Sequence, residues 1–167
     1  MKIDENTTPL LTVDHLKQYF KVSGSFTVKA VEDVSFKIYP GETYGLVGES
    51  GSGKSVTAYS IMQILAETGE ITEGSVKYKG QDITKWSERE LHNFRGSKCS
   101  IIFQDPMTSL NPTMTVGKQI MESLRIHRHL SKKEAREEAI RMLKMVNIPS
   151  AEKRVDSYPH EMSGGMR

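Results

Sequence analysis

The sequence lacks the features that secreted and membrane-spanning proteins need. Its 167 residues hold one cysteine, Cys99, so no disulfide can form within the chain. No apolar run approaches the roughly eighteen residues that would cross a bilayer. The opening MKIDENTTPLL carries acids and no apolar core, unlike a secretory signal. We therefore expect a cytosolic protein, with Cys99 in its apolar CSIIF setting acting as a small buried hydrophobe.

The chain also has little excess of either charge. Lys and Arg number 23 against 21 Asp and Glu, a formal net charge of +2. This balance gives no support for a nucleic-acid partner, and we expect none. The 37% hydrophobic and 26% charged content is typical of a soluble globular domain large enough to bury an ordinary core.

The first half alternates between extended runs and turn signals. Residues 10–13, 28–38 and 75–78 predict an antiparallel β-layer. The run TYGLV, residues 43–47, follows a Pro-Gly turn and predicts a buried strand. Apolar spacing then predicts a helix over residues 55–67 that packs on the sheet.

The later part becomes helical. Ser87 with Glu90 predicts a capping box that opens a short helix, and residues 100–103 predict a second buried strand. A helix is expected over residues 113–130. Another helix begins at the capping pair Ser131 and Glu134. Its predicted apolar face holds Ala135, Ala139, Met142, Leu143 and Val146.

An eight-residue stretch predicts a phosphate-binding loop. Residues 48–55, GESGSGKS, match G-x-x-x-x-G-K-[ST] at every fixed position. Gly51 and Gly53 permit the positive φ angles that turn backbone amides inward. Lys54 would reach the β- and γ-phosphates, and the Ser55 hydroxyl would hold Mg²⁺. The expected phosphate-binding residues are Gly48, Glu49, Ser50, Gly51, Ser52, Gly53, Lys54, Ser55 and Val56.

The alternative is a flexible Gly-Ser loop that binds nothing. A chance match in a chain of this composition is on the order of one in a hundred. The match also follows a predicted strand and opens a predicted helix, as phosphate binding requires. The loop alone does not separate kinases, GTPases, helicases and transport motors.

Two later stretches resemble one family of nucleotide-binding proteins. Residues 101–112, IIFQDPMTSLNP, resemble the Q-loop of ATP-binding cassette (ABC) ATPases, and residues 158–166, YPHEMSGGM, resemble their signature motif, usually LSGGQ. GESGSGKSVTA, FQDPMTSLNP and SGGMR together resemble the ATPases of dipeptide and oligopeptide importers, with nickel importers as near relatives. The resemblance covers about residues 10–167. It implies an α/β P-loop core with an antiparallel β-subdomain over residues 1–105 and a helical subdomain over 106–167.

The resemblance also assigns roles to single residues. Gln104 would reach Mg²⁺ or the attacking water, so Lys54 and Gln104 are the expected catalytic residues and Ser55 and Gln104 the metal ligands. Phe20 would stack on adenine, with Tyr19 as the neighbouring option. The signature residues that would face ATP on a partner subunit are Ser163, Gly164, Gly165 and Met166.

The implied protein is an ATP-driven motor subunit of a peptide importer. It would lie on the cytoplasmic face of the plasma membrane with two permease subunits and a second, non-identical ABC ATPase, and would serve an extracytoplasmic peptide-binding protein indirectly. ATP and Mg²⁺ are the implied cofactors. The alternatives are a soluble ABC ATPase of translation or DNA repair, and a plain P-loop kinase, which gives no reason for SGGMR.

Two further expectations concern what these residues can do. No Walker B strand or switch histidine is found in the 167 residues. We therefore expect an N-terminal portion of an ABC ATPase that does not hydrolyse ATP alone. Seven of the nine methionines fall at or after Met107, which suits adaptable core filling or a surface that grips a permease. His127 and His129 are two apart, so we expect them to be solvated rather than a metal pair.

Overall fold

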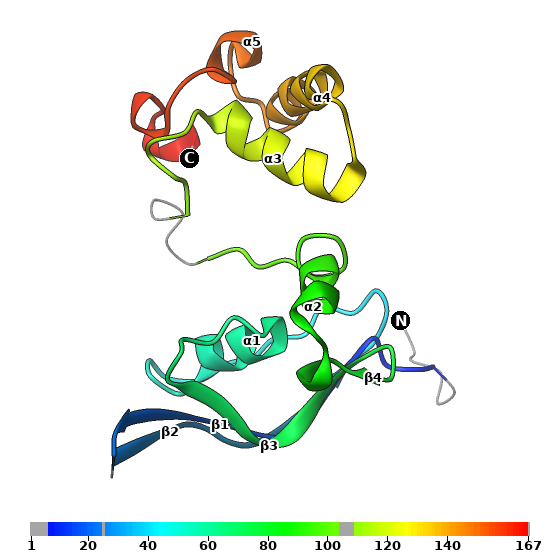
Figure 1. Ribbon diagram of the computed structural model, residues 1–167, viewed down its shortest axis with the longest axis vertical. Coiled ribbons are helices and arrows are strands. Elements are labelled where there is room, and N and C mark those ends of the chain that lie inside the picture. The colour runs from blue at the N-terminus through cyan, green and yellow to red at the C-terminus, as the bar shows by residue number, and fades with distance from the viewer. Residues whose placement is uncertain (1–6, 25, 104–108, 167) are drawn as a thin grey trace. The chain divides into compact units, whose positions relative to one another are not determined.

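The structure is a computed structural model that describes residues 7–24, 26–103 and 109–166 (Figure 1). It divides into two compact units, Met1–Arg95 and Gly96–Arg167, and each is described by itself. Within the described ranges, no helix combines the length and apolar character needed to span a bilayer. The subdomain boundary between residues 105 and 106 remains a proposal about the complete cassette.

The first unit is built on an antiparallel sheet. Its strands are β1 (Leu11–Ser23), β2 (Phe26–Ile38), β3 (Gly69–Tyr78) and β4 (Gln81–Asp82), in the spatial order β2-β1-β3-β4. The predicted antiparallel β-layer is thus confirmed, and its strands are longer than the apolar runs suggested. The apolar runs marked only part of β1 and β3, because polar and charged residues interrupt the apolar ones over residues 14–23 and 69–74.

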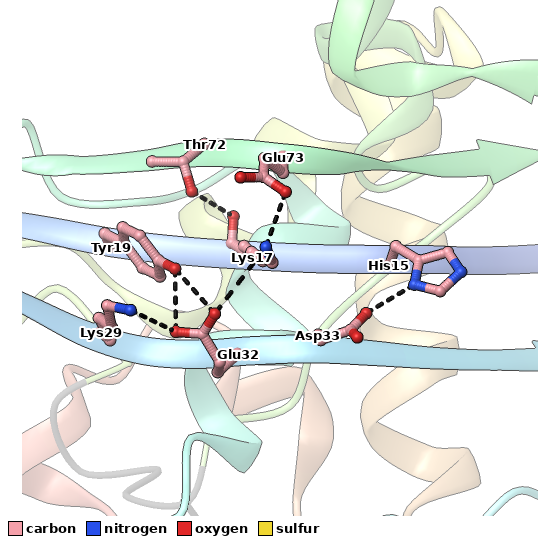
Figure 2. A network of polar contacts seen from close by, with 8 residues as sticks. All are labelled: His15, Lys17, Tyr19, Lys29, Glu32, Asp33, Thr72 and Glu73. Atoms are coloured by element: carbon pink, nitrogen blue, oxygen red, sulfur yellow. Dashed lines mark hydrogen bonds and ion pairs between the residues drawn. The ribbon is translucent and has the colours of Figure 1, made fainter.

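The three long strands bend at one level. His15 and Asp33 have φ angles of 47° and 56°, and Gly74 has a φ of 84°. A Cβ on Gly74 would come within 2.3 Å of the His15 carbonyl oxygen, so the close approach of β1 and β3 requires glycine here. The His15 Nδ1 lies 2.6 Å from Asp33 Oδ1 across the bend (Figure 2).

Helix α1 (Lys54–Met62) lies over one face of the sheet (Figure 1). It is shorter than the predicted range of residues 55–67, because Gln63 takes a left-handed φ of 53° and ends it. The short η1 (Ile83–Lys85) and α2 (Glu88–Phe94) follow β4. The buried apolar residues of this unit are Val13, Leu16, Val31, Met62, Val76, Ile83, Leu91 and Phe94.

The predicted capping box at the start of α2 is confirmed. The Ser87 side chain accepts from the Glu90 amide, and the Ser87 amide donates to the Glu90 carboxylate at 2.8 Å. The Ser87 hydroxyl, which donates to the same carboxylate at 2.7 Å, and the Ser87 amide together hold the pKa of Glu90 below its usual value. The backbone N–H groups of Ser87 and Glu90 therefore both have acceptors at this helix start.

Both predicted buried strands are wrong. Residues 43–47 form no strand, and Val47 is 90% exposed. Residues 100–103 form no strand either, and Ile102 is 96% exposed. A strand needs a neighbour to pair its backbone groups, and among the described residues neither run pairs with another strand.

The second unit is helical. It contains α3 (Val116–Arg128), α4 (Lys132–Met145), α5 (Ala151–Arg154), and the single turns η2 (Pro159–Glu161) and η3 (Gly164–Met166). α3 lies beside α4 in Figure 1. The buried core is Val116, Leu124, Ala135, Ala139, Leu143, Ala151, Val155 and Met162.

Helix α4 matches its predicted start and part of its predicted face. The capping pair Ser131 and Glu134 is confirmed, with the Ser131 amide donating to the Glu134 carboxylate at 2.9 Å. Met142 and Val146 were wrongly placed on the apolar face, since they are 38% and 68% exposed. The small residues of α4 point at α3, so the buried stripe is narrower than the apolar residues alone suggest.

Candidate phosphate-binding site

The loop between residues 48 and 54 depends on glycine at defined points. Gly51 and Gly53 have φ angles of 81° and 86°. A Cβ on Gly53 would lie 2.3 Å from the Ala30 carbonyl oxygen, so the loop packs directly on the backbone of β2. A Cβ on Gly48 would lie 2.6 Å from Ser52 Oγ. Glycine is thus needed in this motif both for its positive φ angles and because a side chain would not fit at Gly48 and Gly53.

Helix α1 begins at the end of this loop. Its first backbone N–H groups have no partner within the helix, and their dipoles give this end partial positive charge. The Lys54 ammonium lies within the loop and donates to the carbonyls of Gly48 at 2.9 Å and Glu49 at 2.6 Å. Ser55, the next residue, is exposed at the helix start. Positive charge and free donors therefore gather at one point.

A cavity of about 270 Å³ opens beside this helix end. Its lining residues are Val28, Lys29, Ala30, Gly51, Ser52, Gly53, Lys54, Ser55 and Val56. The sequence predicted the loop and helix part of this lining but missed the three residues from β2. Strand alternation alone does not say which loop a strand contacts.

The two aromatic candidates for adenine stacking have different surroundings. Tyr19 donates its hydroxyl to both oxygens of the Glu32 carboxylate at 2.9 Å, within a polar network on the exposed sheet face (Figure 2). Phe20 follows it in β1 and so points to the opposite face. Phe20 pairs in register with Val28, which lines the cavity, and its ring contacts the Gly69 position. Phe20 is thus on the α1 side of the sheet.

Lys29 is tied to the same polar network. Its ammonium lies 3.2 Å from the Glu32 carboxylate and 5.3 Å from the centre of the Tyr19 ring. The hydrogen bond from Tyr19 and the bond from Lys29 together hold the pKa of Glu32 below its usual value. Glu32 thus holds the Lys29 ammonium beside Tyr19 on the exposed face of the sheet (Figure 2).

The remaining predicted site residues are Gln104 and the signature residues 163–166. Gln104 lies outside the described residues. The signature residues belong to the second unit, where Ser163, Gly164 and Gly165 are exposed and Met166 is partly buried. The Met166 amide donates to the Ser163 carbonyl at 3.0 Å, which closes the single turn η3. Met162, just before them, is 3% exposed and anchors this segment in the helical core.

The donors of the cavity suit an anion of several phosphates. Backbone N–H groups at a helix start, a lysine and a small hydroxyl side chain are the groups that bind nucleotide phosphates in loops of this type. In the described ranges no cluster of His, Cys, Asp and Glu could hold a metal ion. The predicted ligands of a divalent cation are Ser55, which is exposed at the helix start, and Gln104, which lies outside the described residues.

A second hollow, the α3 groove, lies in the helical unit. It measures about 590 Å³, and its lining residues are Met114, Lys118, Met121, Glu122, Arg125, Ile126 and Lys132. The two methionines and Ile126 supply an apolar surface, and Ile126 is 44% exposed. Among the later methionines, Met162 lies in the buried core, Met114 lines this groove, and Met121 lines the groove and also packs against the core.

Several charged side chains elsewhere in the helical unit form ion pairs. Arg128 lies 2.8 Å and Arg141 2.6 Å from Glu138 Oε1, which holds the pKa of that carboxyl well below its usual range. Arg136 forms a two-pronged pair with Asp156, at 2.7 and 2.6 Å. The charged side chains of the α3 groove make no such ion pairs within the described residues.

Comparisons with known proteins agree on one family. The family described as ABC transporter matches residues 31–167. The oligopeptide transport ATP-binding protein OppD of Salmonella typhimurium is 52% identical over 158 residues, which is 95% of this chain and 47% of that protein. The dipeptide transport ATP-binding protein DppD of Bacillus subtilis is 48% identical over 159 residues, again 95% of this chain and 47% of that protein. The chain thus spans about half the length of the curated relatives it matches.

Solved structures agree as well. A dimeric ATP-binding cassette in a post-hydrolysis state, bound to ADP and Pi, matches with a TM-score of 0.78 and 25% identity. The match covers 93% of this chain and 64% of that one. The predicted fold class, an ABC ATPase core with an antiparallel sheet and helices, is confirmed.

Proposed function

Because this chain belongs to the ABC transporter family, we propose that it is the nucleotide-binding part of an ATPase subunit that drives peptide import. The peptide assignment is supported by relatives named for oligopeptide and dipeptide transport that match 95% of the chain. The residues that would hold Mg·ATP are those of the loop and helix start, 48–56, with Phe20 stacking on adenine. ATP supplies the free energy that the importer uses.

One observation carries this proposal. The loop packs on β2 through Gly53 and places the Lys54 ammonium and the start of α1 beside one cavity. A flexible Gly-Ser linker would have no reason to contact the Ala30 carbonyl at the position where only glycine fits. The arrangement is specific for a compact anion with several oxygens.

The catalytic part of the proposal goes beyond these residues. Lys54 would stabilise charge that develops on the transferred phosphoryl group, and Gln104 would position water or Mg²⁺. No Walker B carboxylate occurs in the 167 residues, so the chain by itself would bind Mg·ATP without turning it over. In the importer, residues 163–166 would face the nucleotide of a second, non-identical ATPase.

The α3 groove is the proposed contact with the permease subunits. Its apolar lining, with charged side chains that form no ion pair among the described residues, suits an amphipathic segment of a protein partner, and methionines adapt to several packings of that segment. We propose that the subunit docks there on two permeases at the cytoplasmic face of the plasma membrane. An extracytoplasmic peptide-binding protein would contribute only through those permeases.

The test is equilibrium binding of Mg·ATP to the 167-residue chain. Lys54→Ala should lose tenfold or more in affinity, about 1.4 kcal/mol or greater, because a charge-assisted phosphate contact is removed. Lys37→Ala, an exposed lysine on β2, is the matched control and should bind as the wild type does. Equal binding by both variants would contradict the phosphate site. Sustained phosphate release that is abolished by Lys54→Ala would contradict the claim that these residues do not turn ATP over.

A further inference from the structure

We propose that Arg95 is a positioning residue that ties the far end of the phosphate-binding helix α1 to the beginning of the second unit. Through this tie, a shift of α1 on nucleotide binding would reach the segment that starts at Gly96. The inference rests on the proposed function, since it requires nucleotide at the start of α1. It assigns Arg95 no contact with the nucleotide.

The Arg95 guanidinium binds the C-terminal carbonyls of α1. Its Nε donates to the Met62 carbonyl at 2.9 Å, and its Nη2 donates to the Gln63 carbonyl. Its Nη1 lies 3.4 Å from the Glu88 carboxylate. A cation at this end of the helix is favoured by the helix dipole, as an anion is at the other end.

The end of α1 needs these two hydrogen bonds. The Ile64 amide donates to the Tyr59 carbonyl at 3.0 Å and the Gln63 amide to the Ser60 carbonyl at 3.1 Å, which is the Schellman pattern. This pattern leaves the next carbonyls, including those of Met62 and Gln63, without intrahelical donors. The left-handed position is occupied by Gln63 rather than the usual glycine, at a cost of about 1–2 kcal/mol. Arg95 offsets that cost with the bonds it donates.

Arg95 is itself held in place by helix α2. It directly follows α2, and its amide donates to the Leu91 carbonyl at 2.8 Å. Phe94, its neighbour, is 2% exposed and makes edge contacts with Tyr78 of β3 and with Trp86 at centroid distances of 5.2 and 5.6 Å. Arg95, which binds the end of α1, therefore directly follows a helix that packs on the sheet.

The residue after Arg95 belongs to the second unit. Gly96 has a φ of 80°, and its amide donates to the Cys99 carbonyl at 2.8 Å. A Cβ on Gly96 would lie 2.7 Å from His127 Nε2 of α3, so this turn packs against the helix that lines the α3 groove. Arg95, which binds the end of α1, is thus directly bonded to Gly96, whose turn packs against α3.

The experiment measures hydrogen exchange with and without saturating Mg·ATP in the 167-residue chain. In the wild type, exchange of residues 96–103 should change about fivefold or more on binding, within the usual range of coupling between sites. In Arg95→Met that change should fall below about twofold while the affinity for Mg·ATP stays within about threefold of wild type. Arg89→Met, an exposed arginine of α2, is the matched control and should behave as wild type.

A second variant separates transmission from simple helix capping. Adding Gln63→Gly to Arg95→Met removes the left-handed strain, so it should recover thermal stability without recovering the nucleotide-dependent change at residues 96–103. Recovery of both would show that Arg95 only caps α1 and would overturn the inference. An unaltered response in Arg95→Met would overturn it too. Failure of the wild type to bind Mg·ATP would instead refute the proposed function, and the transmission with it.

Discussion

Replacing Gly53 by alanine tests the loop most sharply, because Gly51 provides an internal control. Both residues have left-handed φ angles, 86° and 81°. A Cβ on Gly51 would have no atom within 4 Å, whereas a Cβ on Gly53 would lie 2.3 Å from the Ala30 carbonyl oxygen. The two substitutions share a conformational cost, and only Gly53→Ala adds a collision.

The magnitudes follow from these two terms. A left-handed alanine costs about 1–2 kcal/mol, which is the whole effect expected for Gly51→Ala. Relieving a contact at 2.3 Å requires the loop to move away from β2, and overpacking of this kind adds about 1–3 kcal/mol. Gly53→Ala should therefore lower the free energy of unfolding by about 2–5 kcal/mol.

Urea unfolding followed by tryptophan fluorescence gives the readout. Trp86 is the single tryptophan and packs on Phe94 in the first unit, so it reports on that unit. Binding of Mg·ATP, measured in parallel, should weaken more in Gly53→Ala than in Gly51→Ala. Unfolding free energies that agree within about 0.5 kcal/mol for the two variants would refute the close approach to β2.

The other predictions concern the base, the sheet and the groove. Phe20→Ala should weaken ATP binding by about 1–3 kcal/mol while leaving inorganic triphosphate binding unchanged, because stacking acts only on the base; equal losses for both ligands would exclude stacking. The hydrogen bond and charge of Asp33 raise the pKa of His15 above its unfolded value of about 6.5. The stabilisation from this pair is therefore complete below that pH and is lost as pH rises through the pKa of His15 in the folded protein. The difference in the free energy of unfolding between wild type and Asp33→Asn should shrink over the same pH range. A difference that stays constant with pH would contradict the pairing. In the complete transporter, Met121→Lys should reduce ATP-driven peptide uptake, because it places a charge on the apolar floor of the groove, whereas Met145→Lys on exposed α4 should not.

Local signals in the sequence predicted the parts of the fold that depend on neighbouring residues. The capping boxes at Ser87 and Ser131 and the phosphate loop are set by spacing over a few positions, and the structure has the helix starts where the spacing requires. The extended runs predicted the antiparallel sheet, whose pairs β1–β2 and β3–β4 join consecutive strands, although β1 also pairs with the distant β3.

Features that depend on distant pairing were missed or wrong. The apolar runs at residues 43–47 and 100–103 have strand composition but no strand to pair with in the described ranges. Gly53 packs on Ala30 at the β2 side of the cavity, and Arg95 donates to the Met62 carbonyl at the end of α1. Both contacts join residues that are far apart in sequence. No periodicity in the sequence encodes such contacts.

The central claim is that the loop and the start of α1 hold the phosphates of a nucleotide. Calorimetric titration of the chain with Mg·ATP and with AMP tests this most directly, because the two ligands share a base and sugar and differ in phosphate number. The account predicts AMP binding at least about 100-fold weaker, a difference of about 2.7 kcal/mol. Equal affinity for the two ligands would contradict it.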